Sequence, residues 1–299
     1  MLTEFGVSVS VKQCRSFGIS TNDCLAWLLE DCGFRRFRLM SYWDLIEPAP
    51  GTYDFRELDT QIATIRRRKG TVTLGLGARQ PRWPENHWPD WAWKLTKAER
   101  TTALLEFIKT VVKRYHGNDT IVSYQLENEA LLGSFGTRSE VDRDRLRQEF
   151  ALVKQLDPRR PIIMSTSTSW GIPLQRPIPD AVGFSYYQVL FNAHKQRYTK
   201  AFHKIWLHRL RARLIKLIWR RPSFIHELQL EPWGPKNIWE MSLEEQMESM
   251  SPDQIRHTIT QAKEIGLSPI DLWGGEWWYW SAKNGNKEII ESVLKEIGR

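Results

Sequence analysis

The stretch from Thr71 to Leu126 decides the fold of this chain of 299 residues. It opens with TVTLGL at 71–76, a short β-branched and apolar run that is typical of a buried strand. It continues through KAERTTALLEFIKTVVKRY at 97–115, whose apolar residues recur at the spacing of an amphipathic helix. It closes with IVSYQL at 121–126, a second apolar run. The two runs are expected to be parallel strands, because parallel neighbours need a long and usually helical crossover.

The same alternation extends over the whole chain, which favours an α/β fold with a parallel sheet. Eight strand-like runs predict a closed (β/α)8 TIM barrel that forms a single domain over residues 1–299, rather than an open doubly wound sheet. The glycine-rich GxGxxG fingerprint of a dinucleotide-binding sheet is absent from the sequence. The expected strands are Phe5–Ser10, Phe34–Met40, Thr71–Leu76, Ile121–Leu126, Pro161–Ser167, Val182–Tyr187, Ser223–Ile225 and Ile270–Trp273. The expected helices are Asn22–Asp31, with Thr21 as N-cap, and Arg56–Lys69, Lys97–Tyr115, Arg138–Leu156, Thr199–Arg220, Asp253–Ile265 and Lys287–Ile297.

The composition is that of a globular protein, with 41% hydrophobic and 26% charged residues. A net charge of +8 suggests anionic partners.

The three cysteines, Cys14, Cys24 and Cys32, show no CxxC spacing, so neither a disulfide framework nor a zinc site is expected. No metal or cofactor is expected. The beginning MLTE shows no leader, which leaves cytoplasm and secretion after leader removal both open, and no apolar run is long enough to span a membrane. The oligomeric state is not predicted.

In (β/α)8 barrels the active site lies at the carboxyl ends of the strands. Those ends are rich in carboxylates and tryptophan in this sequence, and they carry no cluster at metal-ligand spacing and no GxSxG elbow. Cleavage of a glycosidic bond needs one protonated and one ionised carboxyl group. Tryptophan faces stack on sugar rings, so both features point to a carbohydrate ligand.

Three segments resemble the clan of retaining β-glycosidases on (β/α)8 barrels, which includes families 5, 10, 39 and 42. They are FRLMSYWDLIEPAPGTYDF at 37–55, YQLENE at 124–129 and FIHELQ at 224–229. The resemblance implies that Glu129 is the acid/base and Glu227 the nucleophile. It implies that Asn128 binds the sugar 2-hydroxyl and that Arg38 holds Glu227 ionised. It also implies a hydroxyl near the nucleophile from Tyr186 or Tyr187, and a Trp273 floor under the sugar.

Some assignments stay open at this point. Glu231 and Glu276 also lie near strand ends and compete with Glu227 as nucleophile, and Glu276 is alternatively a sugar ligand. Strand alternation sends only one of Tyr186 and Tyr187 into the barrel mouth. Further substrate contacts are expected from Trp43 and Trp83.

The sequence therefore predicts a retaining glycoside hydrolase that acts on a β-linked oligosaccharide or polysaccharide. A transglycosylase with the same residues and a non-catalytic carbohydrate-binding barrel are the alternatives. Nucleic acid is not expected as a partner, because the basic residues concentrate in one helix rather than among aromatic residues along a strand.

That basic segment, residues 199–221, alternates large apolar residues with lysine and arginine and contains no acidic residue. Part of it is expected to be the sixth barrel helix, packed on the sheet. The alternative interpretation is an amphipathic helix that contacts an anionic membrane surface.

Overall fold

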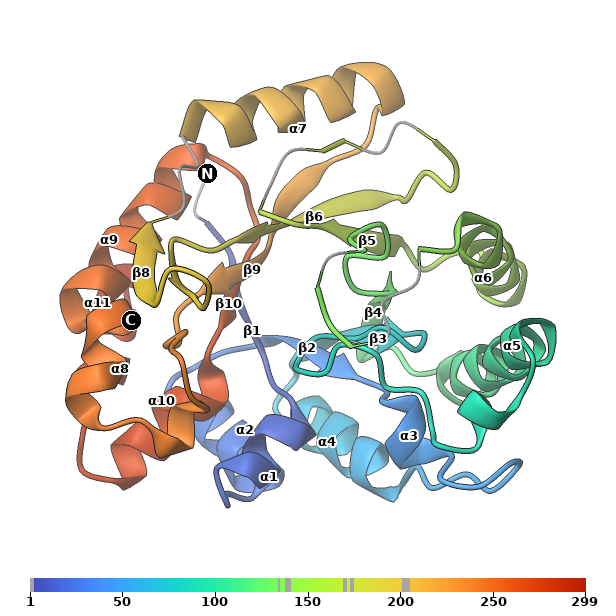
Figure 1. The fold of residues 1–299 in the computed structure, drawn as a ribbon, viewed down its shortest axis with the longest axis horizontal. Coiled ribbons are helices and arrows are strands. Elements are labelled where there is room, and N and C mark those ends of the chain that lie inside the picture. The colour runs from blue at the N-terminus through green and yellow to red at the C-terminus, as the bar shows by residue number, and fades with distance from the viewer. Residues whose placement is uncertain (1–2, 134, 138–140, 169–170, 173–174, 201–204) are drawn as a thin grey trace.

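The chain forms a closed barrel of eight parallel strands with helices around it (Figure 1). The computed structural model describes residues 3–133, 135–137, 141–168, 171–172, 175–200 and 205–299. Every pair of neighbouring barrel strands is parallel, and the first strand closes the barrel against the last. This confirms the predicted (β/α)8 barrel. The strands are β1 Phe5–Ser8, β2 Arg36–Met40, β3 Thr71–Leu76, β4 Ile121–Leu126, β5 Ile162–Thr166, β6 Ala181–Tyr186, β9 Ser223–Gln229 and β10 Ile270–Trp273.

The α-helices that follow the strands surround the barrel (Figure 1). Helix α2 has Ser20 as its N-cap, whose hydroxyl accepts from the Asp23 backbone N–H, so the predicted cap at Thr21 is wrong by one residue. Helix α10 was not predicted, because its sequence GEWWYWSAK is dense in aromatic residues and lacks an amphipathic period. The helices are α1 Val11–Ser16, α2 Thr21–Glu30, α3 Trp43–Ile46, α4 Arg56–Arg67, α5 Lys97–Tyr115, α6 Arg143–Leu156, α7 Ile205–Trp219, α8 Leu243–Met250, α9 Pro252–Ile265, α10 Gly275–Lys283 and α11 Glu288–Ile297.

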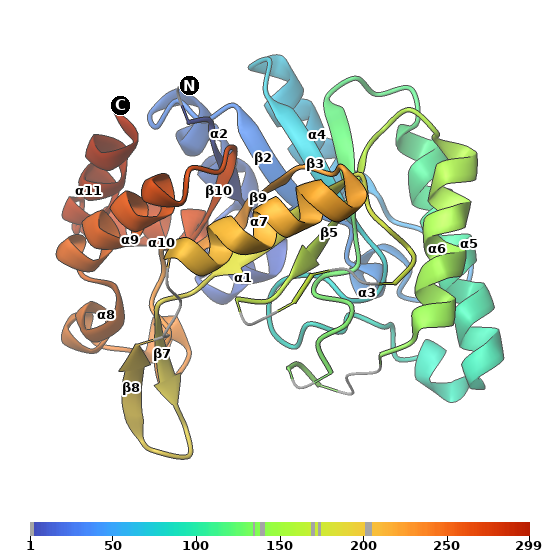
Figure 2. The same ribbon diagram turned by 90° about the horizontal axis from the view of Figure 1, so that it is seen from above.

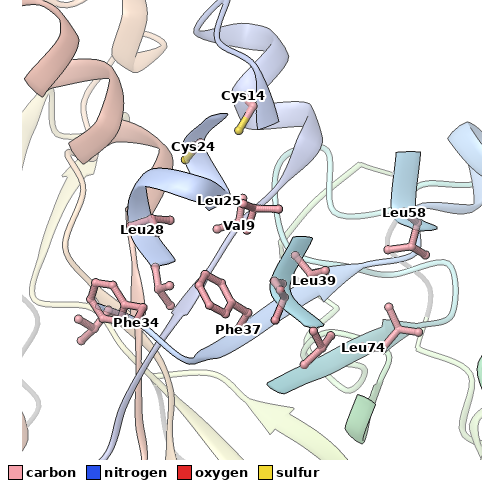
Figure 3. Close-up of a cluster of buried hydrophobic side chains, with 14 of the residues drawn as sticks. Val9, Cys14, Cys24, Leu25, Leu28, Phe34, Phe37, Leu39, Leu58 and Leu74 are labelled. Atoms are coloured by element: carbon pink, nitrogen blue, oxygen red, sulfur yellow. The ribbon is translucent and has the colours of Figure 1, made fainter. Parts of the chain in front are cut away.

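The hydrophobic core lies largely between the barrel wall and the helices. Figure 3 shows part of this layer, where Phe37 and Leu39 of β2 and Leu74 of β3 face side chains of the surrounding helices. Cys14 and Cys24 belong to the same layer, and all three cysteines are buried and free. They serve as small apolar core residues.

The segment before α7 differs from the prediction of one helix from Thr199. A hairpin of β7 (Val189–Asn192) and β8 (Arg197–Lys200) precedes the helix, and Thr199 pairs with Leu190 in it. The hairpin projects from the barrel (Figure 2). Residues 201–204 of the predicted helix lie outside the described residues, as do residues 138–140 at the start of the predicted Arg138–Leu156 helix. Among the described residues, no helix has the length and apolar character that a membrane span requires.

Candidate active site

Glu227 stands near the end of β9, with both carboxylate oxygens occupied. Its Oε2 accepts a hydrogen bond from Arg38 Nη1 at 2.8 Å, and its Oε1 accepts one from the Tyr187 hydroxyl at 2.5 Å. Arg38 comes from β2 and is 1% exposed, and Glu227 is 8% exposed. The two hydrogen bonds fix the orientation of the Glu227 carboxylate, and this geometry suits a nucleophile.

Tyr187, rather than Tyr186, faces Glu227. The Tyr186 hydroxyl instead donates to Gln261 on helix α9 at 3.0 Å, and its ring packs against His208 of α7. Tyr186 therefore points into the layer between the barrel and the helices, as strand alternation requires for one of two successive residues.

Asn128 follows β4 and connects Arg38 to a third strand. Its Oδ1 accepts from Arg38 Nη2 at 3.1 Å and from the Ser165 hydroxyl of β5 at 3.0 Å. Arg38 thus bridges Glu227 and Asn128 with the two ends of its guanidinium. The planar fork of arginine fixes the separation of these two side chains.

Glu129 lies at the same mouth and is held differently. Its Oε1 accepts from the Ser185 hydroxyl of β6 at 2.6 Å, and its backbone N–H donates to Ser165 at 2.8 Å. Burial, and then the negative charge of Glu227, raise the pKa of Glu129 to about 7. A carboxyl group of this kind still carries its proton near neutral pH, which suits a general acid.

Glu85 is a third carboxyl group at the site, and the sequence reasoning missed it. It is 5% exposed, and its Oε2 accepts from Asn128 Nδ2 at 3.0 Å. Burial and the charge of Glu227 raise its pKa to about 8. Its position depends on a loop after β3 in which Arg82 and Glu85 both have positive φ, 91° and 70°. The sequence signal was a carboxylate among the tryptophans of that loop, in WPENHW at 83–88.

Trp273 ends β10 and packs against a buried ionic cluster. The Arg82 guanidinium lies 4.0 Å from the centre of its ring, and its indole N–H donates to Glu231 Oε1 at 2.8 Å. Arg82 also pairs with Glu231 and with Glu276, the latter at 2.9 Å. Glu276 is fully buried and accepts a hydrogen bond from the Ser10 backbone N–H, so it connects Arg82 to the backbone that follows β1. Both rival carboxylates for the nucleophile are thus engaged by Arg82.

A line of aromatic rings runs from the surface to Tyr187. Trp83, 66% exposed, contacts Phe135 at 6.0 Å between ring centres, and Phe135 contacts Trp233 at 5.8 Å. Trp233 then lies edge-on to Tyr187 at 5.6 Å. Three loops, those after β3, β4 and β9, contribute to the line. It places aromatic rings in sequence between the exposed Trp83 and the partner of Glu227.

Trp43 is a correction to the predicted site. It is fully buried in α3, with its ring 5.2 Å from Trp88 and 5.4 Å from Phe107 of α5. Its indole N–H donates to Glu47 at 2.6 Å. The chain turns into α3 directly after the end of β2, so Trp43 enters the outer core instead of the mouth.

Comparisons with known proteins show which sequences and folds this chain resembles. A family model described as beta-galactosidase, glycoside hydrolase family 42, matches residues 26–156. This match includes Asn128 and Glu129 and ends before Glu227, and it spans less than half of the chain. Over these residues the chain is similar to that glycoside hydrolase family, and its barrel has the fold of the wider clan. Its family within that clan is unassigned, and no curated protein matches the chain.

Solved structures of this clan share the fold at low sequence identity. A GH5_18 protein from Streptomyces cattleya in complex with GlcNAc has a TM-score of 0.68 at 15% identity, over 99% of this chain and 80% of that one. An endo-β-1,4-xylanase of family 10 from Gloeophyllum trabeum has a TM-score of 0.66 at 15% identity, over 99% and 96%. The exo-β-1,4-mannosidase Op5Man5 from Opitutaceae bacterium strain TAV5 has a TM-score of 0.64 at 15% identity, over 99% and 59%.

Proposed function

We propose that this glycoside hydrolase cleaves a β-linked oligosaccharide or polysaccharide with retention of configuration, using Glu227 as nucleophile and Glu129 as acid/base. One observation carries the proposal: Glu227 lies beside Arg38, whereas the pKa of Glu129 is raised to about 7. A carboxylate paired with a buried guanidinium and a second carboxyl group with a raised pKa at the same mouth match the two roles in this reaction.

In the first step Glu227 attacks the anomeric carbon while Glu129 donates its proton to the departing glycosidic oxygen. The bond from carbon to that oxygen breaks, and an ester bond from carbon to Glu227 forms. Oε1 is the attacking oxygen in this proposal, because Tyr187, its partner, is partly exposed and can turn away. Arg38 is buried and keeps Oε2 in place throughout.

In the second step Glu129, now ionised, takes a proton from water, and the hydroxide oxygen attacks the anomeric carbon. The ester breaks, Glu227 leaves as a carboxylate, and Glu129 regains its proton. Asn128 is proposed to bind the 2-hydroxyl of the sugar, with Glu85 beside it as a neutral acid that can donate to a hydroxyl. Trp273 and the line from Trp83 to Trp233 are proposed to contact the sugar rings.

The test is hydrolysis of a panel of aryl β-glycosides by the wild type and by Glu227→Gln. We expect release of the aryl group by the wild type and a loss of at least about a thousandfold in kcat for the variant, because no covalent intermediate can form. Glu244→Gln, an exposed glutamate on α8, is the matched control and should retain wild-type rates.

The acid/base role has its own signature in the same panel. Glu129→Gln should lose activity steeply on glycosides with poor leaving groups and much less on dinitrophenyl glycosides, whose departure needs no proton. Full activity in Glu227→Gln would overturn the proposed nucleophile. Sugar binding without any turnover by the wild type would point to a carbohydrate-binding barrel instead.

A further inference from the structure

Helix α7 lies along the outer wall of the barrel beside β6 and β9 (Figure 1), and one side of it is buried. Leu207, Arg211 and Ile215 are on that side, each 4% exposed or less. Arg211 donates to Thr166 Oγ1 at 2.9 Å and to the Gly171 carbonyl at 3.0 Å. The barrel therefore fixes which side of the helix faces outward.

The outward side carries an apolar ridge. Trp206, Leu210 and Leu217 are 55%, 41% and 78% exposed. At about 100° of rotation per residue, these three side chains lie within about 40° of one another around the helix axis. With Ile218, this one helix holds four of the ten large apolar residues that are exposed in the described part of the chain. An apolar surface concentrated in this way marks an interaction site.

A cationic strip of Arg209, Arg213 and Lys216 runs directly beside the ridge, within about 60° around the same axis, and Arg220 follows the last residue of the helix. No aspartate or glutamate occurs between residues 205 and 222. In the described part of the chain, no carboxylate pairs with Arg213, Lys216 or Arg220, and Arg209 donates to backbone carbonyls. These four exposed residues therefore present charge with no neutralising partner.

We propose that α7 docks this protein on an anionic lipid surface. The apolar ridge would enter the boundary between headgroups and acyl chains, and the adjacent cations would bind the anionic headgroups. A second copy of the chain fits this face poorly, because pairing of two such helices brings like charges together. A nucleic acid would use the cationic strip and leave the apolar ridge without a role.

The test is co-sedimentation of the full chain with phosphatidylcholine vesicles, with and without phosphatidylserine. We expect binding only to the vesicles that contain phosphatidylserine, weakening as salt increases. The triple variant Arg213→Gln, Lys216→Gln, Arg220→Gln should bind about a hundredfold more weakly, because each basic residue contributes roughly fivefold. The double variant Trp206→Ser, Leu217→Ser should bind at least about tenfold more weakly.

The control is the double variant Trp239→Ser, Leu243→Ser, which removes two apolar residues that are 38% and 53% exposed elsewhere on the surface. It should bind like the wild type, and circular dichroism should show that every variant is folded.

Three results would overturn the proposal: no binding to anionic vesicles at low salt, an equal loss of vesicle binding in the control, or no loss of vesicle binding in the Trp206→Ser, Leu217→Ser variant. The last result would indicate a general polyanion site. Loss of a dimer in the same variant, measured by light scattering, would assign the face to a second copy.

Discussion

Glu129 is held by two opposing influences, and Ser185 sets the balance between them. Burial and the charge of Glu227 raise the pKa of Glu129, whereas the hydrogen bond from the Ser185 hydroxyl favours its ionised form and lowers it. The resulting pKa of about 7 predicts that kcat/KM falls as pH rises through about 7, because Glu129 in the free enzyme then loses its proton.

Removal of the Ser185 hydroxyl should move the decrease of kcat/KM to higher pH. In Ser185→Ala the ionised form of Glu129 loses a stabilising hydrogen bond, so the alkaline limb of kcat/KM should move up by about one pH unit. Ser123→Ala is the control, because Ser123 is a buried residue on β4 whose hydroxyl forms a hydrogen bond with the Thr73 hydroxyl at 2.8 Å. A limb that stays in place, or that moves in Ser123→Ala as well, would contradict the proposed role of Glu129.

The loops that follow the strands hold the aromatic line, which is proposed to bind the sugar units of longer substrates. Trp233 contacts both Phe135 and Tyr187, so it connects the exposed end of the aromatic line to the partner of Glu227, the proposed nucleophile. Trp233→Ala should raise KM for long β-glycans by about three- to tenfold, since an aromatic contact contributes about 0.5–1.5 kcal/mol. Its kcat on a small aryl glycoside should change less.

The matched control for this loop is Trp239→Ala. Trp239 is a neighbouring tryptophan that packs edge-on against Phe17 at 6.0 Å and takes no part in the aromatic line. Substrate kinetics on glycans of increasing length measure the difference. An equal rise of KM in both variants would mean that the aromatic line does not bind sugar.

At the level of elements, the barrel strands could be predicted because each is a short apolar run between clear turn residues, and β3, β4 and β10 have the expected bounds. The hairpin before α7 could not, because Thr199 is in a strand only through its pairing with Leu190. Periodicity within one segment does not encode a pairing between two segments.

The same distinction applies to the site. Glu129 and Glu227 were among the candidates because strand ends meet at one mouth in any such barrel, and the family resemblance implied their roles. Glu85 was missed because its place depends on left-handed backbone at Arg82 and Glu85 and on the close packing of Gly136 against its Cβ. Trp43 was misplaced because the next helix turns it outward, and a residue type alone does not reveal that direction.

For the molecule as a whole, the proposed acid lowers the stability of the fold. The pKa of Glu129 is about 7 in the folded chain against 4.5 as the ordinary value, so the folded state holds a proton that the unfolded state releases. Its contribution to the free energy of unfolding therefore falls as pH rises from about 4.5 to about 7, and stays low above.

Glu129→Gln should accordingly abolish most of the activity and yet stabilise the protein at pH 8, by up to about 3 kcal/mol. Thermal unfolding of both proteins at pH 5 and pH 8 measures this, and the difference at pH 5 should be about a quarter of that at pH 8. Glu227→Gln provides the opposite case, because it leaves Arg38 buried without its counter-charge and should lower stability. A destabilised Glu129→Gln at pH 8 would refute the account of Glu129 given above.

Arg211 connects the outer helix α7 to the residues at and after the end of β5. Its guanidinium is buried in the flank of α7, and its acceptors, Thr166 Oγ1, the Ser167 carbonyl and the Gly171 carbonyl, all belong to the stretch at and after the end of β5. Thr166 and Ser167 directly follow Ser165, whose hydroxyl accepts a hydrogen bond from the backbone N–H of Glu129. Arg211 thus joins the outer helix to residues next to the mouth through these hydrogen bonds. A ligand that displaced α7 would have to move or break them.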